Sequence, residues 1–180
     1  MPEPDFVQST FTRRGDLVEA RLSLLLDNHI EEVWSALTQP FLLAQWLAPG
    51  EIELHVGGAA KLQFVDSGIV IDSQVTAYKF QQVLEYSWSG PGEPVRPLRW
   101  ELEPLGPITR LTLTLRLPAD EDAGRAAAGW AAHLDMLAAA LAGAPSKFPF
   151  AVFKAAQEAY SQRLQSEIGS QAGQYAVSVA

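Results

Sequence analysis

The chain contains no cysteine among its 180 residues. Disulfides, thiolate nucleophiles and iron–sulfur clusters are therefore excluded. Histidine is scarce as well, because only His29, His55 and His133 occur, far apart and in no HxH or HxxxH spacing. Since no cluster supplies the ligands that zinc requires, we expect neither a metal site nor a cofactor.

Basic residues are in deficit, with 13 Lys and Arg against 21 Asp and Glu, for a formal net charge of -8. An acidic surface repels phosphate backbones, so no nucleic-acid partner is predicted. The apolar runs are far shorter than the roughly 20 residues that span a bilayer, so no membrane span is predicted. The stretch Met1–Asp5 is acidic and lacks the apolar segment of a secretory signal, and we expect a cytoplasmic protein.

The chain has enough hydrophobic residues for one large core, because 48% of its residues are hydrophobic and 19% are charged. That balance and length favour a single domain. We predict an N-terminal lead-in over residues 1–16, with a strand around Phe6–Thr12. The main domain is predicted over 17–143, and a C-terminal helical extension and tail over 144–180.

Apolar residues alternate with polar ones over residues 17–26, which predicts a strand with one buried face. Six further strands are predicted from the same pattern over residues 52–56, 60–64, 69–78, 84–88, 98–102 and 111–117. In the 69–78 strand, we expect Ile69, Ile71, Val75 and Ala77 to share one face. Short turns between successive strands indicate an antiparallel meander, whose apolar face needs a cover.

Helical spacing predicts that cover. Residues 30–37 and 40–47 are expected to form two short helices, the second beginning at Pro40. Residues 123–142 are rich in alanine and predict a long helix, capped by the acidic run 120–122. The fold class is therefore α+β, with a curved antiparallel sheet of about seven strands wrapped around a long C-terminal helix. Such a sheet leaves an apolar cavity beside the helix.

A last helix is predicted over about residues 150–167, with Phe150 and Phe153 on it. It either packs on its own domain or forms a homodimer with a second copy.

Aromatic residues are the candidate walls of the cavity. All five tryptophans fall on the apolar phase of their predicted elements, where they either fill the core or line a hollow for an apolar ligand. The candidate ligand-binding residues are Trp34, Trp46, Phe64, Tyr86, Trp88, Trp100, Trp130, His133 and Met136. Among them, His133 and Tyr86 are the candidate polar contacts.

Two residues are candidates for proton transfer. His133 follows Trp130 by three positions on the long helix and is able to orient a ligand or carry a proton. The alternative is a helix-packing histidine bonded to a neighbour. Asp72 lies mid-strand in an apolar stretch, where it faces either the cavity or the outside. No set of catalytic residues is assigned.

Three functions remain open at this point. The leading hypothesis is a non-enzymatic module that binds a small hydrophobic molecule. The second is an enzyme of cyclase or hydrolase type that uses His133 or Asp72. The third is a protein-interaction module that contacts a chaperone or a regulator through the outer face of the sheet.

Four segments in this order resemble a known family: Val33–Thr38, Leu43–Trp46, Val56–Ala59, and Gly129-Trp130 with His133-Leu134. Their order and spacing are similar to those of the START-like helix-grip superfamily (SRPBCC), and within it to the activator of heat shock protein 90 ATPase homologue-like family. The resemblance covers about residues 15–143 and extends more loosely to 167.

The resemblance implies a strand, two small helices, six strands and a long helix held in the grip of the sheet. Members are mostly small bacterial proteins that bind hydrophobic ligands such as lipids, polyketides or aromatic metabolites. The cochaperone that gives the family its name carries an additional N-terminal domain, for which this chain has no room. We therefore expect a small hydrophobic molecule as partner, and the resemblance disfavours a chaperone.

Overall fold

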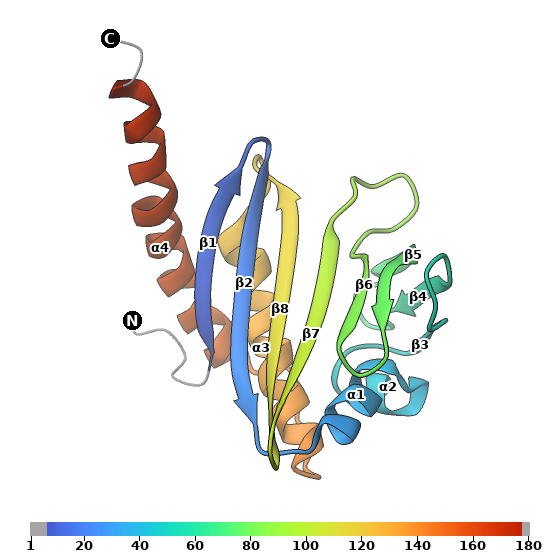
Figure 1. Cartoon of the computed structure of the whole chain (residues 1–180). Helices are drawn as coiled ribbons and strands as arrows, with labels where there is room; N and C mark the ends of the chain where they lie inside the picture. Colours follow the sequence, from blue (N-terminus) through green and yellow to red (C-terminus); the bar gives the residue numbers. More distant parts are fainter. Residues whose placement is uncertain (1–6, 178–180) are drawn as a thin grey trace.

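An eight-stranded antiparallel sheet frames the protein (Figure 1), for which a computed structural model describes residues 7–177. Its strands are β1 (Gln8–Arg14), β2 (Leu17–Leu26), β3 (Gly50–Ile52), β4 (Ala59–Gln63), β5 (Val70–Lys79), β6 (Val83–Ser87), β7 (Pro97–Leu105) and β8 (Ile108–Pro118). They follow the order β1-β2-β8-β7-β6-β5-β4-β3. Every neighbour is consecutive in sequence except the pair β2 and β8, where Leu22 lies opposite Leu113.

The helices are α1 (Ile30–Thr38), α2 (Pro40–Trp46), α3 (Ala123–Leu141) and α4 (Phe150–Val177). Pro40 occupies the first turn of α2, where its missing N–H costs no helical hydrogen bond. Asp122 caps α3, since its carboxylate accepts a hydrogen bond of 2.9 Å from the Arg125 amide. The helix-grip arrangement predicted from the sequence is confirmed, with α3 lying across one face of the sheet (Figure 1).

The core lies between α3 and the inner face of the central strands. In β8, Leu111, Leu113 and Leu117 are at most 1% exposed, and α3 contributes the small buried side chains Ala127 and Ala131. Full burial of each leucine contributes roughly 1.5–3 kcal/mol. Because alanine is short, the helix axis can approach the leucines closely.

The sheet has eight strands rather than about seven, because the lead-in strand at β1 pairs with β2 along its whole length. The two short helices accordingly follow the second strand and not the first. Polar residues dominate β1, and Phe11 is its one large inward side chain, at 2% exposure. This pattern is too weak to predict an integral strand of the sheet.

The strand predicted over 52–56 is wrong beyond Ile52. The chain turns after β3, and Val56 is 65% exposed. The turn is closed at Gly58, whose amide donates to the His55 carbonyl at 2.9 Å. A Cβ at Gly58 would lie 2.5 Å from the Glu53 carbonyl oxygen, so the turn requires glycine there.

The single face predicted for the 69–78 strand is wrong at its C-terminal end. Ile71 and Val75 are buried, and Ile69 lines the same cleft as Ile71, but Ala77 is only half-buried. The pairing register with β6 shifts between Val75 and Ala77. Such a bulge breaks the two-residue alternation of a strand.

α4 packs on its own domain, against α3 and β1. The Phe11 and Tyr160 rings lie 5.5 Å apart, and the Phe11 amide donates to Glu167 Oε2 at 2.8 Å. α4 thus covers an edge strand that would otherwise offer unpaired backbone groups to other chains. The helix extends to Val177, ten residues beyond the predicted end, and homodimer formation stays a prediction.

The packing of α4 on α3 generates a stability prediction. A Cβ at Gly124 would lie 3.2 Å from both Leu164 Cδ1 and Ser161 Oγ, whereas a Cβ at Gly129 would meet nothing within 4 Å. We expect Gly124→Leu to lower the free energy of unfolding in urea by about 1–3 kcal/mol through overpacking. Gly129→Leu on the same helix is the matched control, and it should not lower stability because leucine is the better helix former. Equal stability of the two variants would contradict close packing at Gly124.

Candidate ligand-binding cleft

A cleft of about 580 Å³ lies between α3 and the inner face of the sheet. Its volume falls within the range of about 300–1,000 Å³ that is usual for small-molecule sites. Most of the lining is apolar: Phe64, Ile69, Ile71, Trp88, Leu115, Leu117, Ala126, Trp130 and Phe153. The sequence thus builds a hollow next to a well-packed core.

α3 faces the cleft with one stripe of residues. Arg125, Gly129 and His133 are four residues apart, so they lie on one side of the helix, and all three line the cleft. Gly129 leaves open space where any other residue would place a side chain. Arg125 and His133 are about 12 Å apart along the helix axis, at 1.5 Å per residue. The stripe therefore runs from a charged rim to an aromatic interior.

Aromatic rings meet edge to face in that interior. The Trp88 and Trp130 centroids lie 4.7 Å apart at 70°, and those of Phe64 and Trp88 lie 6.0 Å apart at 85°. The His133 ring is 6.0 Å from Phe64 and 5.7 Å from Trp130. This geometry suits the quadrupoles of the rings and leaves ring edges and faces for a flat ligand.

His133 is held by one hydrogen bond, with Nδ1 lying 3.2 Å from the Trp46 carbonyl oxygen. A carbonyl only accepts, so Nδ1 carries the proton in this bond. Burial lowers the pKa of His133 below its ordinary value of 6.5, against the smaller opposing effect of the bond to Trp46. The imidazole is therefore neutral at pH 7, with its lone pair on Nε2.

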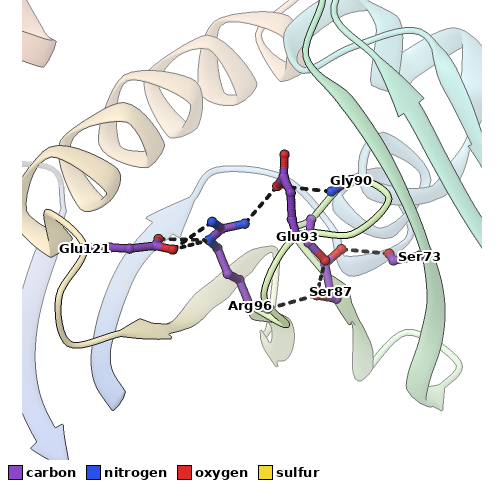
Figure 2. A network of polar contacts seen from close by, with 7 residues as sticks. Ser73, Ser87, Gly90, Glu93, Arg96 and Glu121 are labelled. Carbon is purple, nitrogen blue, oxygen red and sulfur yellow. Dashed lines mark hydrogen bonds and ion pairs between the residues drawn. The ribbon is translucent and has the colours of Figure 1, made fainter. Parts of the chain in front are cut away.

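Charged residues gather at the rim, where the loop between β6 and β7 meets the start of α3 (Figure 2). Arg96 Nε and Nη2 donate to the Glu121 carboxylate at 2.7–3.0 Å, and Arg96 Nη1 donates to Glu93 at 2.9 Å. The Gly90 amide also donates to Glu93, and this bond, followed by the Arg96 bond, lowers the pKa of the Glu93 carboxyl. The guanidinium thus ties the loop to the segment just before α3.

Serines hold the base of the same loop (Figure 2). Ser73 Oγ donates to the Ser87 carbonyl at 2.7 Å, and the Arg96 amide donates to Ser87 Oγ at 2.9 Å. A Cβ at Gly90 would lie 2.7 Å from the Val70 carbonyl oxygen, so the loop presses directly on β5. The rim is consequently a fixed part of the cleft.

The structure brings four of the nine candidate residues together on the cleft: Phe64, Trp88, Trp130 and His133. Trp46, Tyr86 and Trp100 are instead 1% exposed and belong to the core. Trp46 Nε1 donates to the Ala36 carbonyl at 2.8 Å, and the Trp46 and Trp100 rings meet at 5.9 Å. Burial raises the pKa of Tyr86, which is opposed by a hydrogen bond from the Trp100 side chain.

The remaining two candidates also lie away from the cleft. Trp34 is buried beside Tyr78 and Phe80, with both ring distances at 6.0 Å. Met136 is half-buried against the core. Trp46 in addition borders a second hollow of about 350 Å³, which α1, α2 and the end of α3 enclose.

Asp72 does not face the cavity. Its side chain is exposed on the outer face of the sheet, in register with the exposed Lys61 of β4. The hypothesis that Asp72 transfers protons in the cavity is therefore wrong. Side chains alternate between the two faces of a strand, so Asp72 points to the face opposite to that of its buried neighbour Ile71. His133 alone remains from that hypothesis.

The sequence interpretation missed several residues of the cleft. Arg96 and Glu121 lie in loops, where no periodicity marks the inward side. Phe153 comes from α4, and Phe148 precedes that helix with its ring 5.6 Å from His133. Arg125 offered no signal beyond its place on the helical wheel, eight residues before His133.

Within residues 7–168, whose side chains the structure describes, no three His, Cys, Asp or Glu side chains gather in a way that could hold a metal ion. None of the helices within residues 7–177 is long and apolar enough to cross a bilayer.

The tie between Arg96 and Glu121 predicts local rather than global effects. We expect Glu121→Gln to speed amide hydrogen exchange at Gly90 and Glu93, because the loop loses its attachment to the segment just before α3. The free energy of unfolding should change by less than about 1 kcal/mol, since the pair is partly exposed. Glu103→Gln is the control: it breaks a similar pair with Arg110, 2.7 Å long, at a distant hairpin. Equal rates of amide hydrogen exchange at Gly90 and Glu93 in the two variants would contradict a role of the Arg96–Glu121 pair in holding the loop.

The lowered pKa of His133 predicts a pH dependence of stability. A histidine whose pKa is depressed by folding contributes stability that is fully present above about pH 6.5 and is lost as the pH falls below it. We expect the free energy of unfolding to drop between about pH 7.5 and 5.5 by more in the wild type than in His133→Asn. Urea denaturation at the two pH values measures the difference. An identical drop in both proteins would show that burial does not disfavour the imidazolium.

Comparison with solved structures finds the same fold in several bacterial proteins. CalU16 from Micromonospora echinospora, solved by solution NMR, is similar with a TM-score of 0.75 and 20% identity, covering 93% of this chain and all of CalU16. The protein encoded by gene BPP1335 from Bordetella parapertussis has a TM-score of 0.67 and 31% identity, covering 91% of this chain and 94% of its own.

A third similar structure is DynU16, from the dynemicin biosynthetic locus, with a TM-score of 0.65 and 27% identity. The match covers 75% of this chain and 51% of DynU16, so this chain spans about half of that protein. No curated protein matches the sequence. The family model described as activator of Hsp90 ATPase homolog 1-like protein matches residues 27–142. On this match and on its helix-grip fold, the chain belongs to the activator of Hsp90 ATPase homolog 1-like family of the START-like superfamily.

Proposed function

We propose that the protein binds a small hydrophobic molecule, such as a lipid, a polyketide or an aromatic metabolite, in the cleft between α3 and the sheet. The observation that carries the proposal is the open space beside Gly129, which faces the rings of an aromatic-lined hollow of about 580 Å³. Apolar ligand area buried there contributes about 25 cal/mol per Å² before the costs of association. The similarity to DynU16, a protein from a biosynthetic locus, supports a small-molecule ligand.

A cyclase- or hydrolase-type reaction is the second candidate, and His133 is the observation that favours it. A neutral imidazole with a free lone pair in a cleft is able to accept a proton. Its described hydrogen-bond partner, the Trp46 carbonyl, orients the ring but adds no second titratable group. Ligand binding therefore explains more features of the cleft than catalysis does, since only His133 favours catalysis.

The experiment fills the cleft at Gly129. The hydrophobic fluorophore N-phenyl-1-naphthylamine serves as the probe, and fatty acids, flavonoids and polyketide-like aromatics serve as competitors. We expect Gly129→Leu to weaken probe binding by about tenfold or more, a loss of about 1.4 kcal/mol, because the leucine side chain occupies the space that the probe would fill.

Gly129→Ala is the matched control, since one methyl group leaves most of the cleft open and should change affinity by less than about threefold. Thermal melts check that both variants are folded. Undiminished probe binding by a folded Gly129→Leu variant would place the ligand elsewhere and overturn the proposal.

A further inference from the structure

We propose that the ligand carries a hydroxyl group on an aromatic ring, and that this hydroxyl donates a hydrogen bond to Nε2 of His133. The inference rests on the proposed function and narrows it from hydrophobic molecules in general to phenols. It also assigns an orientation, with the hydroxyl end of the ligand inside the cleft and the rest of it toward the rim.

The first step is the tautomer of His133. Trp46 is the last residue of α2, and its carbonyl is one of those at the end of a helix that find no amide within the helix. The His133 Nδ1 atom, 3.2 Å away, supplies the missing donor. Because that bond requires the hydrogen on Nδ1, the neutral ring presents a bare acceptor at Nε2.

The second step is that this acceptor is available to a ligand. His133 lines the cleft, and no donor to Nε2 is present among the side chains and amides of the described residues. Its ring neighbours Phe64, Trp130 and Phe148 offer only ring contacts. A polar atom placed among apolar rings gains most from a partner that brings its own hydrogen.

The third step is the choice among donors. A carboxylate, an ether or a ketone has no hydrogen to give, so none of them satisfies Nε2. The rim also disfavours an anionic ligand, since Glu93, Glu121 and Asp122 outnumber Arg96 and Arg125 there. Arg96 is already neutralised by the first two of these acids.

The fourth step concerns the shape of the ligand. The Trp88 ring stands edge to face against both Trp130, at 70°, and Phe64, at 85°, and all three rings line the cleft. Flat aromatic ligands fit such surfaces with little loss of conformational entropy. A phenol combines this flat body with a hydroxyl that donates more strongly than an aliphatic alcohol, because its pKa is only about 10.

The test compares 2-naphthol with 2-methoxynaphthalene by isothermal titration calorimetry at about pH 7.5. The two ligands share the bicyclic body, but the methyl ether cannot donate a hydrogen bond. We expect the wild type to bind 2-naphthol about tenfold more tightly, as one buried hydrogen bond would give. Equal affinities would overturn the inference and leave the proposed function standing, whereas binding of neither ligand would contradict both.

Variants at His133 separate the acceptor from a packing role. His133→Asn keeps an N–H where Nδ1 stands and removes the acceptor at Nε2. We expect this variant to bind 2-naphthol and 2-methoxynaphthalene with about equal affinity. His133→Gln is the matched control, because its longer amide can restore an acceptor near Nε2 and part of the preference. The ratio of affinities is taken within each protein, so a smaller folded fraction cancels. A preference that survives in His133→Asn would overturn the inference.

A second measurement needs no substitution. The chain has only three histidines, so the ¹⁵N resonances of the His133 ring can be assigned. We expect the free protein to show the Nδ1–H tautomer, and 2-naphthol to shift the Nε2 resonance by more than 2-methoxynaphthalene does. An Nε2–H tautomer in the free protein would overturn the inference.

Discussion

The position of α3 against the sheet is the constraint on which the rest of the structure depends. On one side of the helix, Ala127 and Ala131 are at most 1% exposed and allow close packing on the leucines of the central strands. On another side, Trp130 and His133 are too large for such an approach, and Gly129 adds no volume to fill the space between them. One helix therefore seals the core along part of its surface and holds a cleft open along the rest. The hollow follows from the order of small and large side chains along 127–133.

His133 joins the packing of the fold to the chemistry of the cleft. Its Nδ1 satisfies the carbonyl at the end of α2, which a buried helix end requires. The same bond fixes the tautomer and leaves the lone pair on Nε2 of a residue that lines the cleft. On the sequence alone, a helix-packing histidine and a ligand contact are alternatives. The structure makes the two interpretations of His133 compatible. Nδ1 has the packing role, and the proposed ligand contact involves the other ring nitrogen, Nε2.

Much of the fold is predictable because alternation and helical spacing are local properties of the sequence. The long strands β2, β7 and β8 keep a two-residue pattern over residues 18–24, 98–102 and 111–117, and the cap at Asp122 is visible as an acidic run. The bulge after Val75 and the turn at Gly58 are set by neighbouring strands, so the isolated pattern predicts a longer, simpler strand in each case. For the tryptophans, the pattern shows which face of the element is apolar. It does not show whether that face packs against other side chains or lines a cleft. Trp100 and Trp130 look alike in sequence, yet only Trp130 borders the cleft.

The cleft also depends on segments that lie outside residues 27–142, the part matched by the family model. α4 contributes Phe153 to the lining, and the segment before it brings Phe148 against the His133 ring. α4 is in turn held by β1, through the contact between Phe11 and Tyr160. The shared region therefore supplies strands β3 to β8, α3 and His133, while β1, β2 and α4 come from outside it and α4 lines part of the cleft. The cleft is thus shaped by the shared region and by α4 together, so a ligand found for one relative does not transfer to this chain through the shared region alone.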